Sequence, residues 1–326
     1  MSVNHPYRSL QLPRNAAFEL MPSPGKGWGA FATRPIQRGS LILRERALFG
    51  ILESPVEIME CDIFAAFLQL SPIQKRQLGL LRKNGSGQFT SLVDILAENS
   101  FDSRDESLSH GLFVLGSRFN HLCLPNARVP ITPGPFIELH AIKDIEAGEE
   151  IYFCYVADLK VKTKHERHEF LNFVCNCKAC LPGTLFQELS DLRRRLIRGM
   201  LYITRGVDLD GEIQTSQSPV IVNPELKAAA EGHDIPLTSN CLLEEEGLLD
   251  DWAVKIVGVS VGEPAALFKS EYNRRIVKLA MAQDTWLKKF QVAFPLYGRA
   301  DPADLFMTML QRVNQVYSGG ALAPWT

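Results

Sequence analysis

Three cysteines crowd into six residues near the middle of the chain, as Cys175-Asn176-Cys177-Lys178-Ala179-Cys180. Thiolates at this spacing suit Zn2+, which takes four tetrahedral sulfur or nitrogen ligands in structural sites. The alternative, three unrelated structural thiols, is disfavoured because crowded exposed thiols are prone to oxidation. A fourth ligand must come from elsewhere, and the sequence leaves six candidates open: Cys61, Cys123, Cys154, Cys241, His165 and His168.

A second group of polar residues lies upstream, in the run Asn120-His121-Leu122-Cys123-Leu124-Pro125-Asn126. Amide side chains carry both donors and acceptors, so this run could bind the edge of an adenine or a carboxylate. A polar loop tied by turns of its own asparagines explains the same composition equally well.

Two further segments could approach a ligand. The first is Gly25-Lys26-Gly27-Trp28-Gly29, whose glycines allow close backbone contact, although a plain β-turn is the favoured interpretation. The second is Asp144–Ile151 with Tyr155 a few residues later. Its carboxylates could be catalytic, but a solvated turn before a strand is favoured. Tyr155 is either a core aromatic residue or a hydroxyl aimed into a site.

Length and composition limit the classes of protein. A chain of 326 residues suggests about two domains. Hydrophobic residues make up 46% and the net charge is −2, which excludes a strongly basic chain built to wrap phosphate backbones. The sequence shows no apolar run near the roughly 20 residues of a membrane span and no signal peptide, so an intracellular location is expected.

The elements that must position these motifs change along the chain. Residues 1–14 are expected to form an extended arm, residues 55–99 a helical insertion, and the polar residues 101–109 a loop. After residue 182 amphipathic patterns predict helices only. The expected strands are 28–32, 41–43, 136–142 and 150–155. The helices expected after the insertion are 164–170, 185–204, 225–231, 241–259, 265–290 and 302–317.

In this order the motifs resemble those of SET-domain protein lysine methyltransferases. The glycine-rich segment is similar to their GxG motif, and Asn120–Asn126 to their NHSCxPN motif, with Leu122 in place of serine. Asp144–Tyr155 resembles their DIxxGEEI…Y segment, and Cys175–Cys180 their CxCxxC post-SET zinc site. The resemblance implies an α+β fold over residues 15–182, with short twisted sheets, a knot-like cofactor loop, the helical insertion and a post-SET zinc segment at 170–182.

Within that family the chain resembles the SET and MYND-domain branch, because CxCxxC precedes a helical region. The resemblance implies a tetratricopeptide-like domain over residues 183–326. A MYND zinc finger needs a run of cysteines and histidines, whereas residues 50–110 hold only Cys61 and His110. The finger is therefore expected to be absent, as in fungal-type relatives.

The resemblance also implies residue roles. Tyr155 would be catalytic, steering the lysine amine and the methyl group with its hydroxyl. Leu171 stands where the branch usually has a tyrosine of the lysine channel. Cys123 would complete a structural zinc site with Cys175, Cys177 and Cys180. The residues that would bind S-adenosylmethionine are Pro24, Lys26, Gly27, Trp28, Asn99, Ser117, Asn120, His121, Tyr155 and Phe173.

The implied function is S-adenosylmethionine-dependent methylation of a lysine on a protein, histone or not. One alternative is a catalytically weak SET module that serves as an interaction scaffold. Another is methyl transfer to a small molecule or to the lysine of one dedicated enzyme. The expected partner is a protein substrate, without nucleic acid or membrane, for a monomer in the cytoplasm, the nucleus or both.

Overall fold

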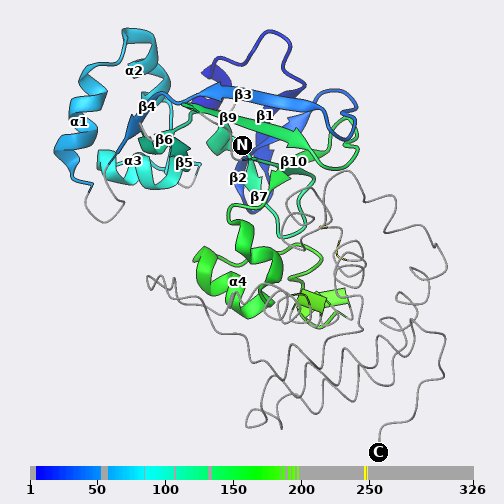
Figure 1. Cartoon of the computed structure of the whole chain (residues 1–326). Coiled ribbons are helices and arrows are strands. Elements are labelled where there is room, and N and C mark those ends of the chain that lie inside the picture. The colour runs from blue at the N-terminus through cyan, green and yellow to red at the C-terminus, as the bar shows by residue number, and fades with distance from the viewer. Residues whose placement is uncertain are drawn as a thin grey trace, which may run out of the picture. The chain divides into compact units, whose positions relative to one another are not determined.

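The computed structural model describes most of the first 184 residues, in two compact units, Met1–Tyr155 and Val156–Thr326 (Figure 1). The boundary expected near residue 183 marks a change in sequence character and stays a prediction. Helices expected at 225–231, 241–259, 265–290 and 302–317, and most of 185–204, lie outside the described residues. The described residues are 5–52, 58–83, 85–105, 108–130, 134–184, Phe186, Gln187, Ser190, Asp191, Arg193, Arg194, Ile197, Glu246 and Leu248.

A four-stranded sheet carries most of the motifs of the first unit. Its order is β1 (Phe18–Ser23), β2 (Gly27–Ala32), β10 (Glu150–Phe153) and β7 (Asn120–His121). β10 runs antiparallel to β2 and parallel to β7, and Ile151 pairs with Ala30 where both are fully buried. The sheet therefore joins segments more than 100 residues apart, and apolar side chains are buried where β2 and β10 pair.

Two smaller sheets complete the strands of the described residues. One has the order β3 (Leu41–Arg46), β9 (Phe136–Ala141) and β8 (Ala127–Arg128). In β9 the inward side chains alternate with half-buried ones, as its sequence predicts. The other has the order β4 (Phe49–Ile51), β6 (Leu108–Leu112) and β5 (Ser100–Asp105). The expected loop at 101–109 is therefore wrong, because these residues form most of an antiparallel hairpin.

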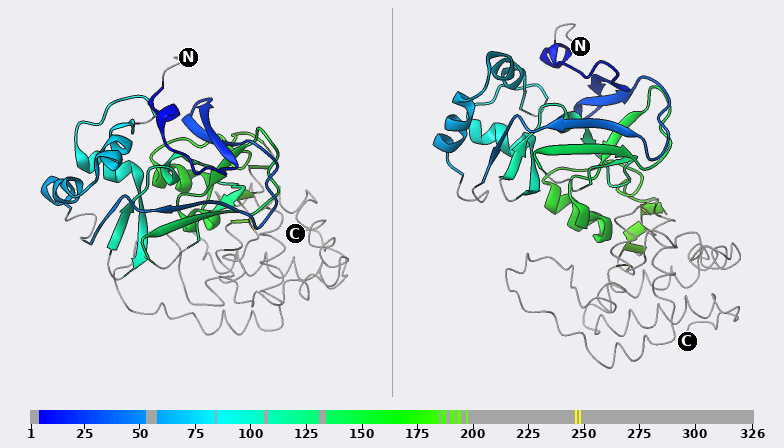
Figure 2. Two further views of the ribbon diagram at one scale, coloured as in Figure 1. Left: turned by 90° about the horizontal axis from the view of Figure 1, so that it is seen from above. Right: turned by 45° about the horizontal axis from the view of Figure 1, so that its top comes forward.

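Three helices of the insertion lie beside the sheet of β4, β5 and β6 (Figure 2). They are α1 (Glu60–Leu68), α2 (Pro72–Gly79) and α3 (Leu92–Asn99). Ser71 and Gln74 form a capping box at the start of α2, which satisfies two backbone donors there. Within the described residues, no helix has the length and apolar character needed to cross a membrane.

The described part of the N-terminal arm, residues 5–14, is packed rather than extended, which corrects the expectation for those residues of the segment 1–14. Residues Pro6–Ser9 form a 3-10 helix, η1, and Tyr7 is 2% exposed. The Tyr7 hydroxyl donates to the Arg82 carbonyl at 3.0 Å, and the His5 ring bonds the Gly85 carbonyl through Nε2 at 2.8 Å. The segment is packed because the buried Tyr7 ring and hydroxyl hold it to the rest of the unit. The mostly polar residues around Tyr7 gave no indication of this in the sequence.

The described part of the second unit begins with η3 (Ala157–Val161) and α4 (Lys164–Leu171). The Glu166 carboxylate accepts from the backbone N–H of Thr163 at 2.5 Å and from its hydroxyl at 2.6 Å, which fixes the start of α4. The helix ends at Leu171 and is capped by Asn172, whose φ of 56° lies in the left-handed region that asparagine tolerates. This turn directs the chain toward the cysteine triplet.

Candidate functional site

The glycine-rich segment forms the tight connection between β1 and β2. Gly25 and Gly27 take φ values of 74° and 78°, so the favoured β-turn interpretation is confirmed. The turn nevertheless belongs to a larger structure. The Trp28 indole stacks on the His5 ring with centroids 4.2 Å apart, and its carbonyl accepts from Asn120 Nδ2 at 3.1 Å. Pro24 and Lys26 lie on this turn, between β1 and β2.

Glu150, the first residue of β10, is a functional candidate that the sequence missed. The sequence favoured a solvated turn here, whereas Glu150 is 7% exposed. Its Oε2 accepts from the hydroxyls of Ser23 at 2.7 Å and Tyr152 at 2.5 Å. Its Oε1 accepts from Asn120 Nδ2 at 2.7 Å. A buried carboxylate needs such donors, and they arrive here from three strands.

Asn126 ties the polar loop to β10. Its Nδ2 donates to the Glu150 carbonyl at 2.9 Å and to Glu149 Oε1 at 3.0 Å, while its Oδ1 accepts from the Tyr152 N–H at 2.7 Å. The side chain is thereby committed to the backbone of the neighbouring strand. Asn126 thus shapes the loop, and Asn120 is the asparagine that faces the glycine-rich turn.

His121 links the loop to Tyr155 and to Cys123. It is 3% exposed, and its Nδ1 accepts from the Tyr155 backbone N–H at 3.1 Å. Because Nδ1 accepts, Nε2 carries the proton of the neutral ring and donates toward Cys123 Sγ at 3.2 Å. Both ring nitrogens are therefore used inside the protein, where the imidazole holds the loop to Tyr155 and to Cys123.

The Tyr155 hydroxyl donates to the Phe119 carbonyl at 3.3 Å. The side chain is 44% exposed, yet desolvation of its hydroxyl raises the pKa of Tyr155 to about 12, with Arg118 acting in the opposite direction. The raised pKa keeps the hydroxyl protonated at neutral pH, so that it can both donate and accept a hydrogen bond.

Asn99 and Ser117 meet at a buried arginine. Arg118 donates to Asn99 Oδ1, to the Tyr7 hydroxyl and, at 2.9 Å, to the Ser117 hydroxyl. Asn99 is fully buried and its Nδ2 donates to the Ile95 carbonyl at 2.8 Å. Burial lowers the pKa of Arg118, which Tyr7 and Tyr155 counteract. Both predicted cofactor residues are therefore positioned by one guanidinium that the sequence analysis did not single out.

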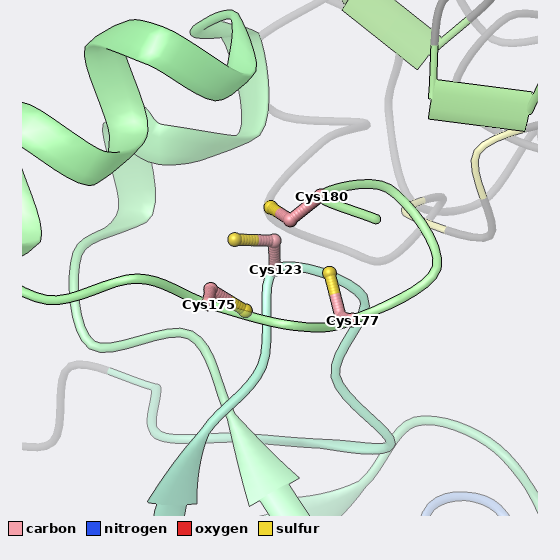
Figure 3. Close-up of side chains that lie close together, drawn as sticks. All are labelled: Cys123, Cys175, Cys177 and Cys180. Atoms are coloured by element: carbon pink, nitrogen blue, oxygen red, sulfur yellow. The ribbon is translucent and has the colours of Figure 1, made fainter. Parts of the chain in front are cut away.

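Cys123, Cys175, Cys177 and Cys180 are all buried, and their Sγ atoms lie within 4.8 Å of one another (Figure 3). Among the described residues this group takes Cys123 as its fourth member, and neither Cys154 nor Cys61 belongs to it. Cys241 lies outside the described residues. Four thiol ligands at this spacing match the donor set of a tetrahedral zinc site.

The cysteine triplet is held by a buried arginine of α4. Arg167 is fully buried, and its guanidinium donates to the carbonyls of Lys162 at 2.6 Å and Ala179 at 2.8 Å and to Cys180 Sγ at 3.2 Å. A cationic donor beside sulfur favours the thiolate form that binds metal. Backbone N–H groups of Cys180 and Leu181 donate to the Cys177 carbonyl and close the turn.

Phe173 and Leu171 lie in the second unit, between α4 and the triplet. Leu171 is the last residue of α4 and is half-buried, while Phe170 and Phe173 are 49% and 44% exposed. The other predicted cofactor residues all belong to the first unit: Pro24, Lys26, Gly27, Trp28, Asn99, Ser117, Asn120, His121 and Tyr155. The role expected for Phe173 stays a prediction.

Residues 27–156 match the family model described as SET domain. The chain is 30% identical over 184 residues to "Histone-lysine N-methyltransferase set5" of Schizosaccharomyces pombe, covering 55% of each protein. It is 35% identical over 111 residues to human "Protein-lysine N-trimethyltransferase SMYD5", covering 31% of this chain and 26% of that one. It is 37% identical over 134 residues to chicken "N-lysine methyltransferase SMYD2", covering 36% of this chain and 30% of that one. The chain thus spans about half or less of these relatives.

Proposed function

We propose that this chain, in which residues 27–156 form a SET domain, is an S-adenosylmethionine-dependent protein-lysine N-methyltransferase. The observation that carries the proposal is the meeting of two distant motifs, where Asn120 Nδ2 bonds both the Trp28 carbonyl and Glu150. Relatives named as histone-lysine and protein-lysine methyltransferases support the same activity. The substrate class is a protein, histone or other, that carries an accessible lysine.

In the proposed reaction a lysine amine attacks the methyl carbon of the sulfonium. The N–C bond forms as the C–S bond breaks, giving methyl-lysine and S-adenosylhomocysteine, and one proton leaves the nitrogen. The amine must be neutral, although a free lysine has a pKa of about 10.4, so desolvation at the site has to favour the uncharged form. Alignment by the protein supplies most of the acceleration. The Tyr155 hydroxyl, which donates to the Phe119 carbonyl, can also accept a hydrogen bond from the amine.

The proposal includes one structural zinc ion held by Cys123, Cys175, Cys177 and Cys180. It is supported by the buried four-thiol cluster and by the Arg167 donor next to Cys180. The ion would order a post-SET segment at residues 170–182 without taking part in the chemistry. Residues 183–326 would form the tetratricopeptide-like helical domain and offer a surface to the protein substrate.

The proposed activity predicts that the purified chain transfers tritiated methyl from S-adenosylmethionine to lysines of proteins in a cell lysate. Mass spectrometry of the labelled bands should find methyl-lysine. A chain that binds S-adenosylhomocysteine but labels no protein, either in a lysate or on a panel of histones, would contradict the proposed activity and favour a binding role.

Tyr155→Phe is expected to lower kcat by about tenfold, because one hydrogen bond in the transition state is lost. The affinity for S-adenosylhomocysteine should change less, by about threefold or under, because the variant keeps the aromatic ring. The rate of both proteins should rise with pH up to about 10, following the substrate lysine. Tyr155 itself, with a pKa of about 12, stays protonated over that range. Rates measured between pH 7 and 10 check this, and a rising limb that disappears in Tyr155→Phe would show that Tyr155 acts as a base.

A further inference from the structure

The carboxylate of Glu150 is the point where three segments of the first unit meet. Ser23 reaches it from the end of β1, Asn120 from β7, and Tyr152 from two residues along β10. The backbone pairing of Tyr152 with Asn120 keeps the two side chains in register. A group that receives three side-chain donors inside the protein is held in one orientation.

That orientation determines which end of the Asn120 amide is offered to a ligand. The two partners of Asn120 Nδ2 are a carboxylate oxygen at 2.7 Å and the Trp28 carbonyl at 3.1 Å. Both partners only accept hydrogen bonds, so the nitrogen of the amide must face them, and both of its hydrogens are used. Asn120 Oδ1 is therefore directed away from this pair, as an acceptor.

A second contact extends the arrangement to the glycine-rich turn. The Tyr152 hydroxyl donates to Glu150, and the Lys26 ammonium lies over the Tyr152 ring, 4.1 Å from its centroid. The cation is attracted by the face of the ring. Lys26 and Asn120 are thereby connected through one tyrosine and one carboxylate.

We propose that Glu150 is a positioning residue of the methyl-transfer site, which fixes the Asn120 amide with its oxygen toward the cofactor. This inference rests on the proposed function. An amide oxygen accepts from the α-ammonium group of S-adenosylmethionine, whereas an amide nitrogen in its place would turn two donors toward a cation. Glu150 acts through Asn120 and does not take the lysine proton, because its oxygens already receive the donors of Ser23, Tyr152 and Asn120.

The test compares two ligands that differ in the amino-acid part. Glu150→Leu keeps an apolar side chain of similar size but removes both acceptors. We expect it to weaken S-adenosylhomocysteine binding by about tenfold or more, because the amide loses its fixed partner. Binding of 5′-methylthioadenosine, which lacks the α-ammonium group, should change less than about twofold. Calorimetry on the full chain measures both affinities.

Two further variants separate positioning from general destabilisation. Glu150→Gln can turn its oxygen to Asn120 and its nitrogen to the two hydroxyls, which also accept, so we expect it to retain most of the affinity. Glu146→Leu removes an exposed carboxylate of the preceding turn and should leave both affinities unchanged.

The outcomes distinguish a positioning role of Glu150 from a purely structural one. A selective loss for S-adenosylhomocysteine in Glu150→Leu, restored in Glu150→Gln, supports the positioning role. Equal weakening of both ligands, or unfolding of Glu150→Gln as well as Glu150→Leu, shows a purely structural role and overturns the inference. Unchanged binding also overturns it. If the unaltered chain binds neither ligand, the proposed function itself fails and the inference fails with it.

Discussion

Gly29→Ala is expected to reduce the affinity for S-adenosylhomocysteine by about 100-fold, since the added methyl group overpacks the centre of the site. A Cβ at this position would lie 2.1 Å from Glu150 Oε1 and 2.8 Å from Asn120 Nδ2. The backbone cannot retreat easily, because Gly29 pairs with Met21 of β1 in the middle of the sheet. Glu150 and Asn120 must therefore move apart, which breaks the hydrogen bond that orients the amide. Titration calorimetry on the folded variant measures the loss.

Gly25→Ala is the matched control within the same motif. Gly25 has a φ of 74° but nothing within 4 Å of an added Cβ, so alanine introduces backbone strain without a clash. Strain of this kind costs of order 1 kcal/mol, which predicts a small loss of stability and less than about tenfold in affinity. If both variants bind equally well, or equally badly, the close approach of Glu150 to Gly29 is not what the site requires.

The role of Gly29 illustrates what the sequence could predict. Glycines at 25, 27 and 29 would allow a ligand close to the backbone, but the sequence favoured a plain β-turn. The structure shows that the side chains of Glu150 and Asn120 approach Gly29. Sequence could not identify Glu150, since its burial depends on donors such as Ser23, 127 residues away. A carboxylate followed by an apolar strand reads as solvated unless those partners are known.

The hairpin of β5 and β6 was missed for a related reason. Its residues 102–109 are mostly polar, and polarity favours a loop when the chain is considered locally. β5, however, lies at the edge of its sheet, where backbone pairing with β6 suffices and one face can remain in water. Phe101 near the start of β5 stacks against Phe153 of β10, with centroids 5.6 Å apart, but a single aromatic residue beside a polar run did not predict a strand.

The cysteine triplet, unlike Glu150 and the hairpin, was recognised from the sequence. Its spacing alone indicated a metal site, but left six candidates for the fourth ligand. The family resemblance implied Cys123 as that ligand, and its proximity to the triplet among the described residues supports the same choice. The sequence likewise gave no reason to separate Arg167 from the other charged residues of α4, because full burial of one arginine is a tertiary property.

Arg167→Met is expected to destabilise the chain by about 3 kcal/mol and to loosen the zinc site, because it removes a buried guanidinium and keeps only an apolar stem. The carbonyls of Lys162 and Ala179 would lose their donors, and Cys180 would lose the cationic group that favours its thiolate. Asp191, whose Oδ1 lies 3.5 Å from Arg167 Nη1, would lose a partner as well. Elemental analysis should find about one equivalent of zinc in the unaltered chain and less than about half in the variant.

His165→Ala on the same helix is the matched control. His165 is 84% exposed, and its pair with Glu169 at 3.2 Å lies on the surface, where such pairs contribute little. We expect its zinc content and thermal unfolding midpoint to match those of the unaltered chain. Arg167→Lys keeps the positive charge on a side chain with fewer donors, so its zinc content and unfolding midpoint should lie between those of Arg167→Met and the unaltered chain. This variant keeps the prediction testable if Arg167→Met does not fold. Zinc lost from His165→Ala would make that histidine a ligand, and zinc retained in Arg167→Met would show that the triplet organises itself without the arginine.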